Sequence, residues 1–237
     1  MSEALLEVRR LRAWYGRAQI LFDVGLEVRR GEVVALMGRN GAGKSTTFKA
    51  IMGLLERTEG EVTFDERELR GLEPYRIARL GLGYVPEDRR IFTELTVMEN
   101  LEVGRRPARD GVPAWSAEKL FALFPNLGEM RERLGGRMSG GEQQMLTVGR
   151  TLMGNPSLVL LDEPSEGIAP KIVEEMAAMI VELKREGLSV LLSEQNLHFA
   201  ELVCDRAYVL EKGQVRYQGT MTELASEPQV KRDYLGV

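Results

Sequence analysis

Cysteine is almost missing from this 237-residue chain, in which Cys204 stands alone. A single cysteine cannot close a disulfide bond within the chain. No apolar stretch approaches the ~20 residues that a membrane-spanning helix needs, and the first residues lack the basic-then-apolar pattern of a secretory signal. These absences predict a chain that does not span a membrane by itself and that fits a reducing, cytosolic setting.

An excess of positive charge is missing as well, since the net charge at pH 7 is −4. The chain therefore lacks a global attraction for a phosphate backbone, and we expect no nucleic-acid partner. The residues that are present are typical of a soluble globular protein, with 43% hydrophobic and 29% charged. This length suits one compact domain and is too short for two nucleotide-binding domains of ordinary size.

Residues 38–45 read Gly-Arg-Asn-Gly-Ala-Gly-Lys-Ser, the complete pattern of a phosphate-binding loop. The loop follows a continuous apolar run at 33–37, typical of a strand buried on both faces, and precedes helical apolar spacing at 46–55. Glycines let the backbone aim several N–H groups inward, and the helix N-terminus adds positive potential. This context predicts a nucleotide site that uses Gly38, Asn40, Gly41, Ala42, Gly43, Lys44, Ser45 and Thr46.

Two side chains of this loop have chemistry of their own. Lys44 can reach the β- and γ-phosphates, which makes it a candidate catalytic residue as well as a binding residue. The Ser45 hydroxyl can bind Mg²⁺. The loop therefore predicts ATP and Mg²⁺ as cofactors.

A second motif brings two adjacent carboxylates, Asp162 and Glu163, to the end of the apolar run 158–161. Ligands of open α/β sheets bind at the carboxyl edge of the strands. If the strand persists, neighbouring residues face opposite ways, so the two carboxylates take different roles. We assign Asp162 to the metal and Glu163 to the general base that activates water. The alternative is that both are merely polar residues that end a strand.

The order of predicted elements indicates an α/β fold. Alternation of apolar and polar residues near 6–8 and 26–28 predicts a small antiparallel sheet, to which 60–64 adds a strand. Between 87 and 154 only helical segments are predicted, separated by prolines. The predicted buried strands are 81–85, 157–161, 189–192 and 207–210, and the predicted helices are 97–105, 117–124, 142–153, 171–184 and 197–203.

We therefore expect a single domain over 1–237. Residues 1–86 and 155–227 would form an α/β core with a mostly parallel sheet and an N-terminal antiparallel β subdomain. Residues 87–154 would form an inserted α-helical subdomain, and residues 228–237 a short docked C-terminal tail.

A third motif, Ser139-Gly140-Gly141-Glu142, lies 23 residues before Asp162. It has the form of a capping box, and apolar residues at helical spacing follow it, so by itself it predicts only a well-capped helix. Together with the other two motifs it resembles the signature of ATP-binding-cassette ATPases, and the resemblance covers essentially the whole chain. It implies a P-loop NTPase (RecA-like) fold and an ATP-hydrolysing subunit.

The resemblance also implies partners. Two cassettes bind head to tail in that family, so Ser139, Gly140, Gly141 and Glu142 would act on the ATP of a second ATPase subunit, a copy of this chain or a sister cassette. Tyr15 would stack on adenine, although packing explains an aromatic there too. Integral membrane permease subunits would dock around 87–100, and a periplasmic or extracellular substrate-binding protein would act indirectly. The subunit would lie peripherally at the cytoplasmic face of the inner or plasma membrane.

Two departures from the common cassette pattern are informative. Glu87 stands where most cassettes have Gln, which puts one more carboxylate near the metal, and Gln195 stands where most have a switch His. Glutamine can still donate an N–H to the γ-phosphate, but it cannot become cationic. The only histidine, His198, follows three residues later on a predicted helix and would point elsewhere.

These departures, with Glu166-Gly167-Ile168 and the ending Tyr234-Leu235-Gly236-Val237, resemble the ATP-binding subunits of bacterial branched-chain amino-acid importers. Importers of urea and short amides share several of the features and are the alternative. The rival classes are soluble cassette regulators, export or lipid-extraction ATPases and non-hydrolysing nucleotide sensors. Soluble regulators need a second cassette or a coiled-coil insertion, and this sequence shows neither. Exporters usually keep the switch His, so Gln195 argues against that class. Lys44, Asp162 and Glu163 are intact, so nothing supports a sensor that does not hydrolyse ATP.

Overall fold

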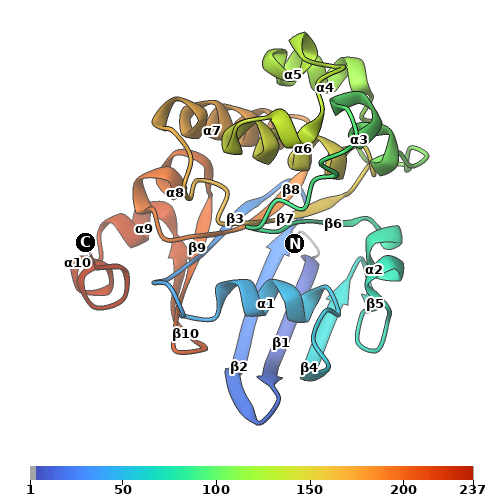
Figure 1. The fold of residues 1–237 in the computed structure, drawn as a ribbon. Coiled ribbons are helices and arrows are strands. Elements are labelled where there is room, and N and C mark those ends of the chain that lie inside the picture. The colour runs from blue at the N-terminus through green and yellow to red at the C-terminus, as the bar shows by residue number, and fades with distance from the viewer. Residues whose placement is uncertain (1–3, 237) are drawn as a thin grey trace.

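The computed structural model of the protein describes residues 4–236, and two β-sheets with surrounding helices make up the fold (Figure 1). The smaller sheet is antiparallel in the order β2-β1-β4-β5, as the N-terminal alternation predicts. Its residues alternate between buried and more exposed positions over much of each long strand, because one face covers the core. The strands are β1 (Ala4–Tyr15), β2 (Ala18–Arg29), β4 (Arg57–Phe64) and β5 (Arg67–Glu68).

The larger sheet has the order β10-β9-β3-β8-β7-β6, and every neighbouring pair is parallel except β10 with β9. The mostly parallel sheet predicted from the sequence is therefore confirmed. The sequence pattern did not predict β10, because this edge strand is mostly polar and none of its residues is fully buried. The strands are β3 (Val33–Met37), β6 (Leu82–Val85), β7 (Leu158–Asp162), β8 (Ser189–Glu194), β9 (Arg206–Glu211) and β10 (Gln214–Thr220).

The predicted helices are present with shifted ends, whereas the helices at Pro74–Leu80, Met221–Ala225 and Pro228–Val230 were not predicted. The first begins at Lys44 rather than 46, and Pro125 starts a helix where the sequence predicted a break, because proline has no N–H to lose in the first turn. The helices are α1 (Lys44–Ile51), α2 (Pro74–Leu80), α3 (Val97–Gly104), α4 (Ala117–Leu123), α5 (Pro125–Glu129), α6 (Gly140–Leu152), α7 (Pro170–Arg185), α8 (Leu197–Val203), α9 (Met221–Ala225) and α10 (Pro228–Val230), with short turns at Gly135–Arg137 and Lys231–Leu235.

Alternate residues of the parallel strands face two hydrophobic cores. Val34 and Leu36 of β3 pack in the core that includes α1 and the small sheet. Val33 and Ala35 pack in the core that includes α6, α7 and α8. The larger sheet therefore lies between two layers, with α6 and α7 on one side and α1 with β1 and β2 on the other (Figure 1). This arrangement keeps the strand ends fixed where the candidate site lies.

The C-terminal segment contacts both a core and the phosphate-binding loop. Tyr234 and Leu235 are partly buried against the core of α6 and α7. The Arg39 guanidinium donates a hydrogen bond of 3.3 Å to the Arg232 carbonyl. The segment thus lies beside the loop that the sequence predicts to bind nucleotide.

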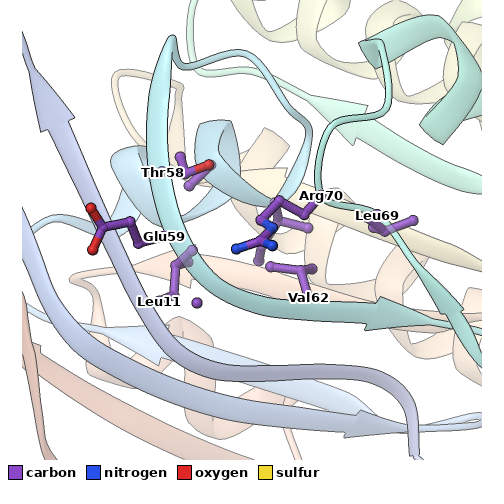
Figure 2. A pocket seen from close by; sticks show the side chains of 9 residues that line it. Leu11, Thr58, Glu59, Val62, Leu69 and Arg70 are labelled. Atoms are coloured by element: carbon purple, nitrogen blue, oxygen red, sulfur yellow. The ribbon is translucent and has the colours of Figure 1, made fainter.

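A small pocket between β1, β4 and α1 is the wrong place for a nucleotide. Its volume is about 20 Å³, close to that of a single water molecule. Figure 2 shows Leu11, Val62 and Leu69 around it, with Glu59 and Arg70 from the surface. None of the residues assigned to ATP lines this pocket.

Asn100 of α3 fixes the segment before that helix. Its side chain is fully buried, accepts a hydrogen bond from the Phe92 N–H and donates to the carbonyl groups of Phe92, Leu95 and Thr96. A buried backbone group left without a partner costs about 1–3 kcal/mol. Asn100 therefore holds 92–96 in one conformation.

Asn100→Ala should lower the free energy of unfolding by about 2–3 kcal/mol, because it leaves several buried backbone groups unpaired. Urea unfolding followed by circular dichroism measures the effect. Glu102→Ala on the same helix is the control, since Glu102 is exposed and its ion pair with Arg105 should contribute less than about 1 kcal/mol. Equal midpoints for both variants would show that Asn100 is not the anchor.

Candidate active site

The phosphate-binding loop joins β3 to α1 and is packed too closely for larger residues. A Cβ atom on Gly38 would lie 2.4 Å from the Leu210 carbonyl oxygen, and one on Gly43 would lie 2.9 Å from Leu21. Both glycines also have positive φ values, 153° and 110°. Glycine is therefore favoured at both positions for two reasons. The backbone conformation suits it, and Leu210 of β9 and Leu21 of β2 lie close to where a Cβ atom would be.

Lys44 lies inside the loop with its charge paired. Its side chain is 3% exposed, and Nζ donates to the carbonyl oxygens of Gly38 at 2.7 Å and Arg39 at 3.2 Å. Nζ also forms an ion pair of 3.0 Å with Oε1 of Glu163. The loop lysine and the strand-end carboxylate, which the sequence assigned separately, are thus in direct contact.

Asp162 is held by three hydroxyl groups. Ser45 and Ser193 donate to its Oδ1 at 3.0 and 2.7 Å, and Tyr84 donates to its Oδ2 at 3.1 Å. Burial, followed by the charge of Asp162, raises the pKa of the Tyr84 hydroxyl, so this group keeps its proton at neutral pH. Tyr84 and Ser193 were not predicted as site residues, because only the pairing of β6, β7 and β8 brings them to Asp162.

Glu163 leaves the strand direction, because β7 ends at Asp162 and Glu163 has φ of 47°. Its backbone N–H donates to the backbone carbonyl of Ser193 at 3.1 Å and to Ser193 Oγ at 3.0 Å. Oε2 is buried and has no hydrogen-bond partner among the described residues. This free carboxylate oxygen is suited to accept a proton from a water molecule.

The oxygen atoms around Ser45 suit Mg²⁺. Residues 4–236 contain no cluster of three or more His, Cys, Asp or Glu residues that could hold a metal ion. Mg²⁺ usually binds to one or two carboxylates together with substrate phosphates, so Ser45 and Asp162 meet the requirement. Glu87, the third residue assigned to the metal, is exposed, and no hydrogen bond or ion pair in the described chain joins it to Asp162.

Glu194, at the end of β8, connects two loops of the site. Its carboxylate is 1% exposed and accepts hydrogen bonds from the N–H groups of Ser165, Gln195 and Asn196 at 3.1–3.2 Å. Burial raises the pKa of this carboxyl group. The sequence analysis assigned Gln195 and passed over Glu194, although an acidic residue after a buried strand is a usable signal.

The assigned Gln195 lies between this turn and α8. Its side chain is half-buried and makes no hydrogen bond to a residue that the structure describes. His198 is exposed on α8. Within residues 4–236, no hydrogen bond or ion pair joins either side chain to Lys44 or Glu163.

The Ser139–Glu142 motif caps α6 as the sequence predicts. Glu142 N–H donates to the Ser139 hydroxyl, and Ser139 N–H donates to the Glu142 carboxylate at 2.7 Å. At the N-terminus of α6, Ser139 is exposed, Gly140 is half-buried beside the Arg89 guanidinium, and Gly141 is buried against Ile172. No hydrogen bond or ion pair between the described residues connects this motif with the phosphate-binding loop of the same chain.

Tyr15 is the last residue of β1 and is 47% exposed. Its neighbour Trp14 is covered by the guanidinium group of Arg57, which lies 4.2 Å from the ring centroid. Of the two aromatic residues, Tyr15 is therefore the one whose ring is open to a flat ligand.

A groove lies beside Tyr84, which is one of the residues that line it. It has a volume of about 550 Å³ and an apolar lining that includes Met52, Leu54, Tyr75, Tyr84, Phe92 and Val103. Leu54, Tyr75, Phe92 and Val103 are 43–53% exposed, unusually high for apolar side chains that lie together. Arg150 also lines the groove, and its buried Nη1 has no partner in the described part of the chain. We call this feature the apolar groove.

Comparisons with known proteins fit this geometry. A sequence model of the family described as "ABC transporter" matches residues 21–166. The chain is 44% identical over 232 residues to the high-affinity branched-chain amino acid transport ATP-binding protein BraG of Pseudomonas aeruginosa, covering 98% of this chain and 100% of BraG. It is 36% identical over 237 residues to the lipopolysaccharide export system ATP-binding protein LptB of Escherichia coli K12, covering 98% of both chains.

The fold matches solved structures over nearly its full length. The ADP conformation of MJ1267, an ATP-binding cassette of an ABC transporter, superimposes with a TM-score of 0.81 at 28% identity and covers 98% of both chains. A nucleotide-free cassette from an ABC transporter gives a TM-score of 0.81 at 28% identity, covering 96% of this chain and 97% of the other. The predicted P-loop NTPase architecture is confirmed.

Glu163→Gln should lower the rate of ATP hydrolysis by roughly 10²- to 10⁴-fold, because an amide cannot act as the base. The same change breaks the ion pair with Lys44, so the lysine is free for phosphate and ADP should bind several-fold more tightly. Steady-state turnover and calorimetric titration with ADP measure the two effects. ADP is used because it lacks the γ-phosphate and is not hydrolysed during the titration. Unchanged ADP affinity would mean that the ion pair does not compete with nucleotide for Lys44. The control is Glu174→Gln, on the exposed face of α7.

Glu166→Gln should change how stability depends on pH. The neighbouring carboxylate of Glu163, then burial and the charge of Glu87, raise the pKa of Glu166 from 4.5 to about 7. The folded protein therefore holds this proton more tightly, and the stabilisation is lost as the pH rises from about 4.5 through about 7. The amide mimics the protonated acid, so urea midpoints of the two proteins should diverge over this range in favour of the variant. Parallel pH profiles would contradict the shifted pKa.

Proposed function

This chain belongs to the ABC transporter family and is an ATPase subunit, and from that premise we propose that it powers the import of branched-chain amino acids. Support for the solute comes from the higher identity with BraG, 44%, than with the export protein LptB, 36%, both over nearly the whole chain. Glu87 and Gln195, which replace the Gln and the switch His of most cassettes, also support an importer of branched-chain amino acids.

For hydrolysis, the observation that carries the proposal is the unpartnered Glu163 Oε2 beside the buried Lys44. We infer that Lys44 leaves its ion pair for the β- and γ-phosphates, while the loop N–H groups bind phosphate oxygens. Glu163 then accepts a proton from the attacking water. Ser45 and Asp162 would hold Mg²⁺, which when bound neutralises charge on the β- and γ-phosphates.

The remaining assigned residues act around this centre in the proposal. Tyr15 offers its exposed ring to adenine, and Gln195 donates an N–H to the γ-phosphate after a local rearrangement of its half-buried side chain. The N-terminus of α6, with Ser139, Gly140 and Gly141, binds the ATP of a second cassette head to tail. We favour a sister cassette as the partner in the cell. No helix in residues 4–236 is long and apolar enough to cross a membrane. Separate permease subunits would form the path of the solute through the membrane.

The apolar groove is the proposed docking site for a permease segment at the cytoplasmic face of the membrane. Its four exposed apolar side chains require an apolar face on the partner. Its rim carries Arg79, Arg90, Arg106 and Arg150, so the matching segment should carry a carboxylate or free carbonyl groups. The exposed guanidinium groups of Arg79, Arg90 and Arg106 would donate to that acceptor. Phe92 lies in the segment 87–100 that the sequence assigned to docking.

Uptake of labelled solutes tests the proposed solute. Cells that lack this gene should take up leucine, isoleucine and valine more slowly, and the parent chain should restore uptake, whereas Glu163→Gln should not. The matched control is Glu174→Gln, which should restore uptake fully.

Other outcomes decide among the alternatives. A selective loss of urea or short-amide uptake would move the chain to that importer class. Normal uptake of all these solutes combined with a damaged outer envelope would support an export role such as that named for LptB. ATP hydrolysis by the purified chain in either case would leave the ATPase assignment intact.

A further inference from the structure

Tyr84 has one part in the apolar groove and another in the active site. Its ring lines the groove together with Leu54 and Phe92. Its hydroxyl donates the hydrogen bond of 3.1 Å to Asp162 Oδ2. Among the residues that line the groove, Tyr84 is the one with a hydrogen bond to an assigned catalytic or metal-binding side chain.

The Tyr84 bond is the sole protein hydrogen bond to Asp162 Oδ2 in the described chain, whereas Oδ1 receives two hydroxyl groups. An O–H···O bond normally measures about 2.7–2.8 Å, so this bond is long and has room to shorten. The orientation of the second carboxylate oxygen therefore depends on where the tyrosine ring lies.

Tyr84 is packed on the side of α1 and is partly open on the side of the groove. The ring meets Phe48 of α1 edge to face, with centroids 6.5 Å apart and planes at 88°. Its strand, β6, is the edge strand of the larger sheet and pairs with β7 alone. Tyr84 is half-buried, so its remaining exposed surface is the part that an occupant of the groove would cover.

We propose that Tyr84 is a positioning residue through which a permease segment in the apolar groove tightens the metal site at Asp162. The occupant packs on the exposed part of the ring, excludes water and shortens the hydrogen bond to Oδ2, which fixes the carboxylate for Mg²⁺. The proposal rests on the docking function of the groove given above. Outer hydrogen bonds of this kind typically change metal affinity by about 10- to 100-fold when removed.

The test fills the groove with a covalent probe and measures metal affinity directly. Val103→Cys places a thiol in the groove, in a Cys204→Ala background, and is labelled with a bulky apolar maleimide. Mn²⁺ affinity is measured by electron paramagnetic resonance in the presence of a non-hydrolysable ATP analogue. Labelling should raise Mn²⁺ affinity several-fold, and Tyr84→Phe should remove this response while lowering the starting affinity by about tenfold.

Three controls separate coupling from general damage. Leu202→Cys carries the same label on exposed α8, outside the groove, and should not change Mn²⁺ affinity. Ser193→Ala removes another hydroxyl from Asp162 but does not line the groove, so it should weaken Mn²⁺ binding and keep the response to the label. Leu54→Cys provides a second labelling position in the groove, and urea unfolding checks each variant.

An equal shift on labelling with and without the Tyr84 hydroxyl would overturn the proposal, and so would no shift from either groove position. Failure of the proposed metal site looks different, because the unlabelled parent would then bind no Mn²⁺ together with the analogue. Retained Mn²⁺ binding with no response to the label would leave that metal site standing and remove the role of Tyr84.

Discussion

Buried negative charge must be paired, and the ends of β7 and β8 bury three carboxylates, Asp162, Glu163 and Glu194. Asp162 receives three hydroxyl groups, Glu163 contacts the Lys44 ammonium, and Glu194 receives three backbone N–H groups. These partners come from the phosphate-binding loop, from β6 and β8, and from the loops after Glu163 and Glu194. The requirement to pair three charges therefore holds the parts of the site together.

The frame for this cluster is the parallel sheet with a core on each face. Strands β3, β7 and β8 are buried throughout, so their ends cannot shift without disturbing packing on both sides. The loops that leave these ends are consequently held at one edge of the sheet, where a ligand meets backbone N–H groups, a lysine and carboxylates together. The apolar groove borders the same sheet at its edge strand β6, which is how Tyr84 reaches both regions.

Much of the fold could be predicted because the signals are local. The continuous apolar runs, the alternation near the N-terminus and the capping box of Ser139 and Glu142 each depend on residues a few positions apart, and all are found. Strand β10 was missed because it is mostly polar and has no fully buried residue, and the helix at Pro125 because a proline both ends and begins helices. Tyr84, Ser193 and Glu194 were missed because their importance lies in contacts between separate strands.

The sequence by itself determined the class of chemistry: a phosphate-binding loop and two strand-end carboxylates predict a nucleotide site with Mg²⁺, and with the capped glycine motif they resemble an ATP-hydrolysing cassette. The tertiary structure decided which groups meet. It pairs Lys44 with Glu163, surrounds Asp162 with hydroxyl groups, leaves Glu87 at the surface and joins the apolar groove to Asp162 through Tyr84. The reason is physical: residue type and spacing fix what a side chain can do, whereas strand pairing and burial fix its neighbours, its charge balance and its exposure to water.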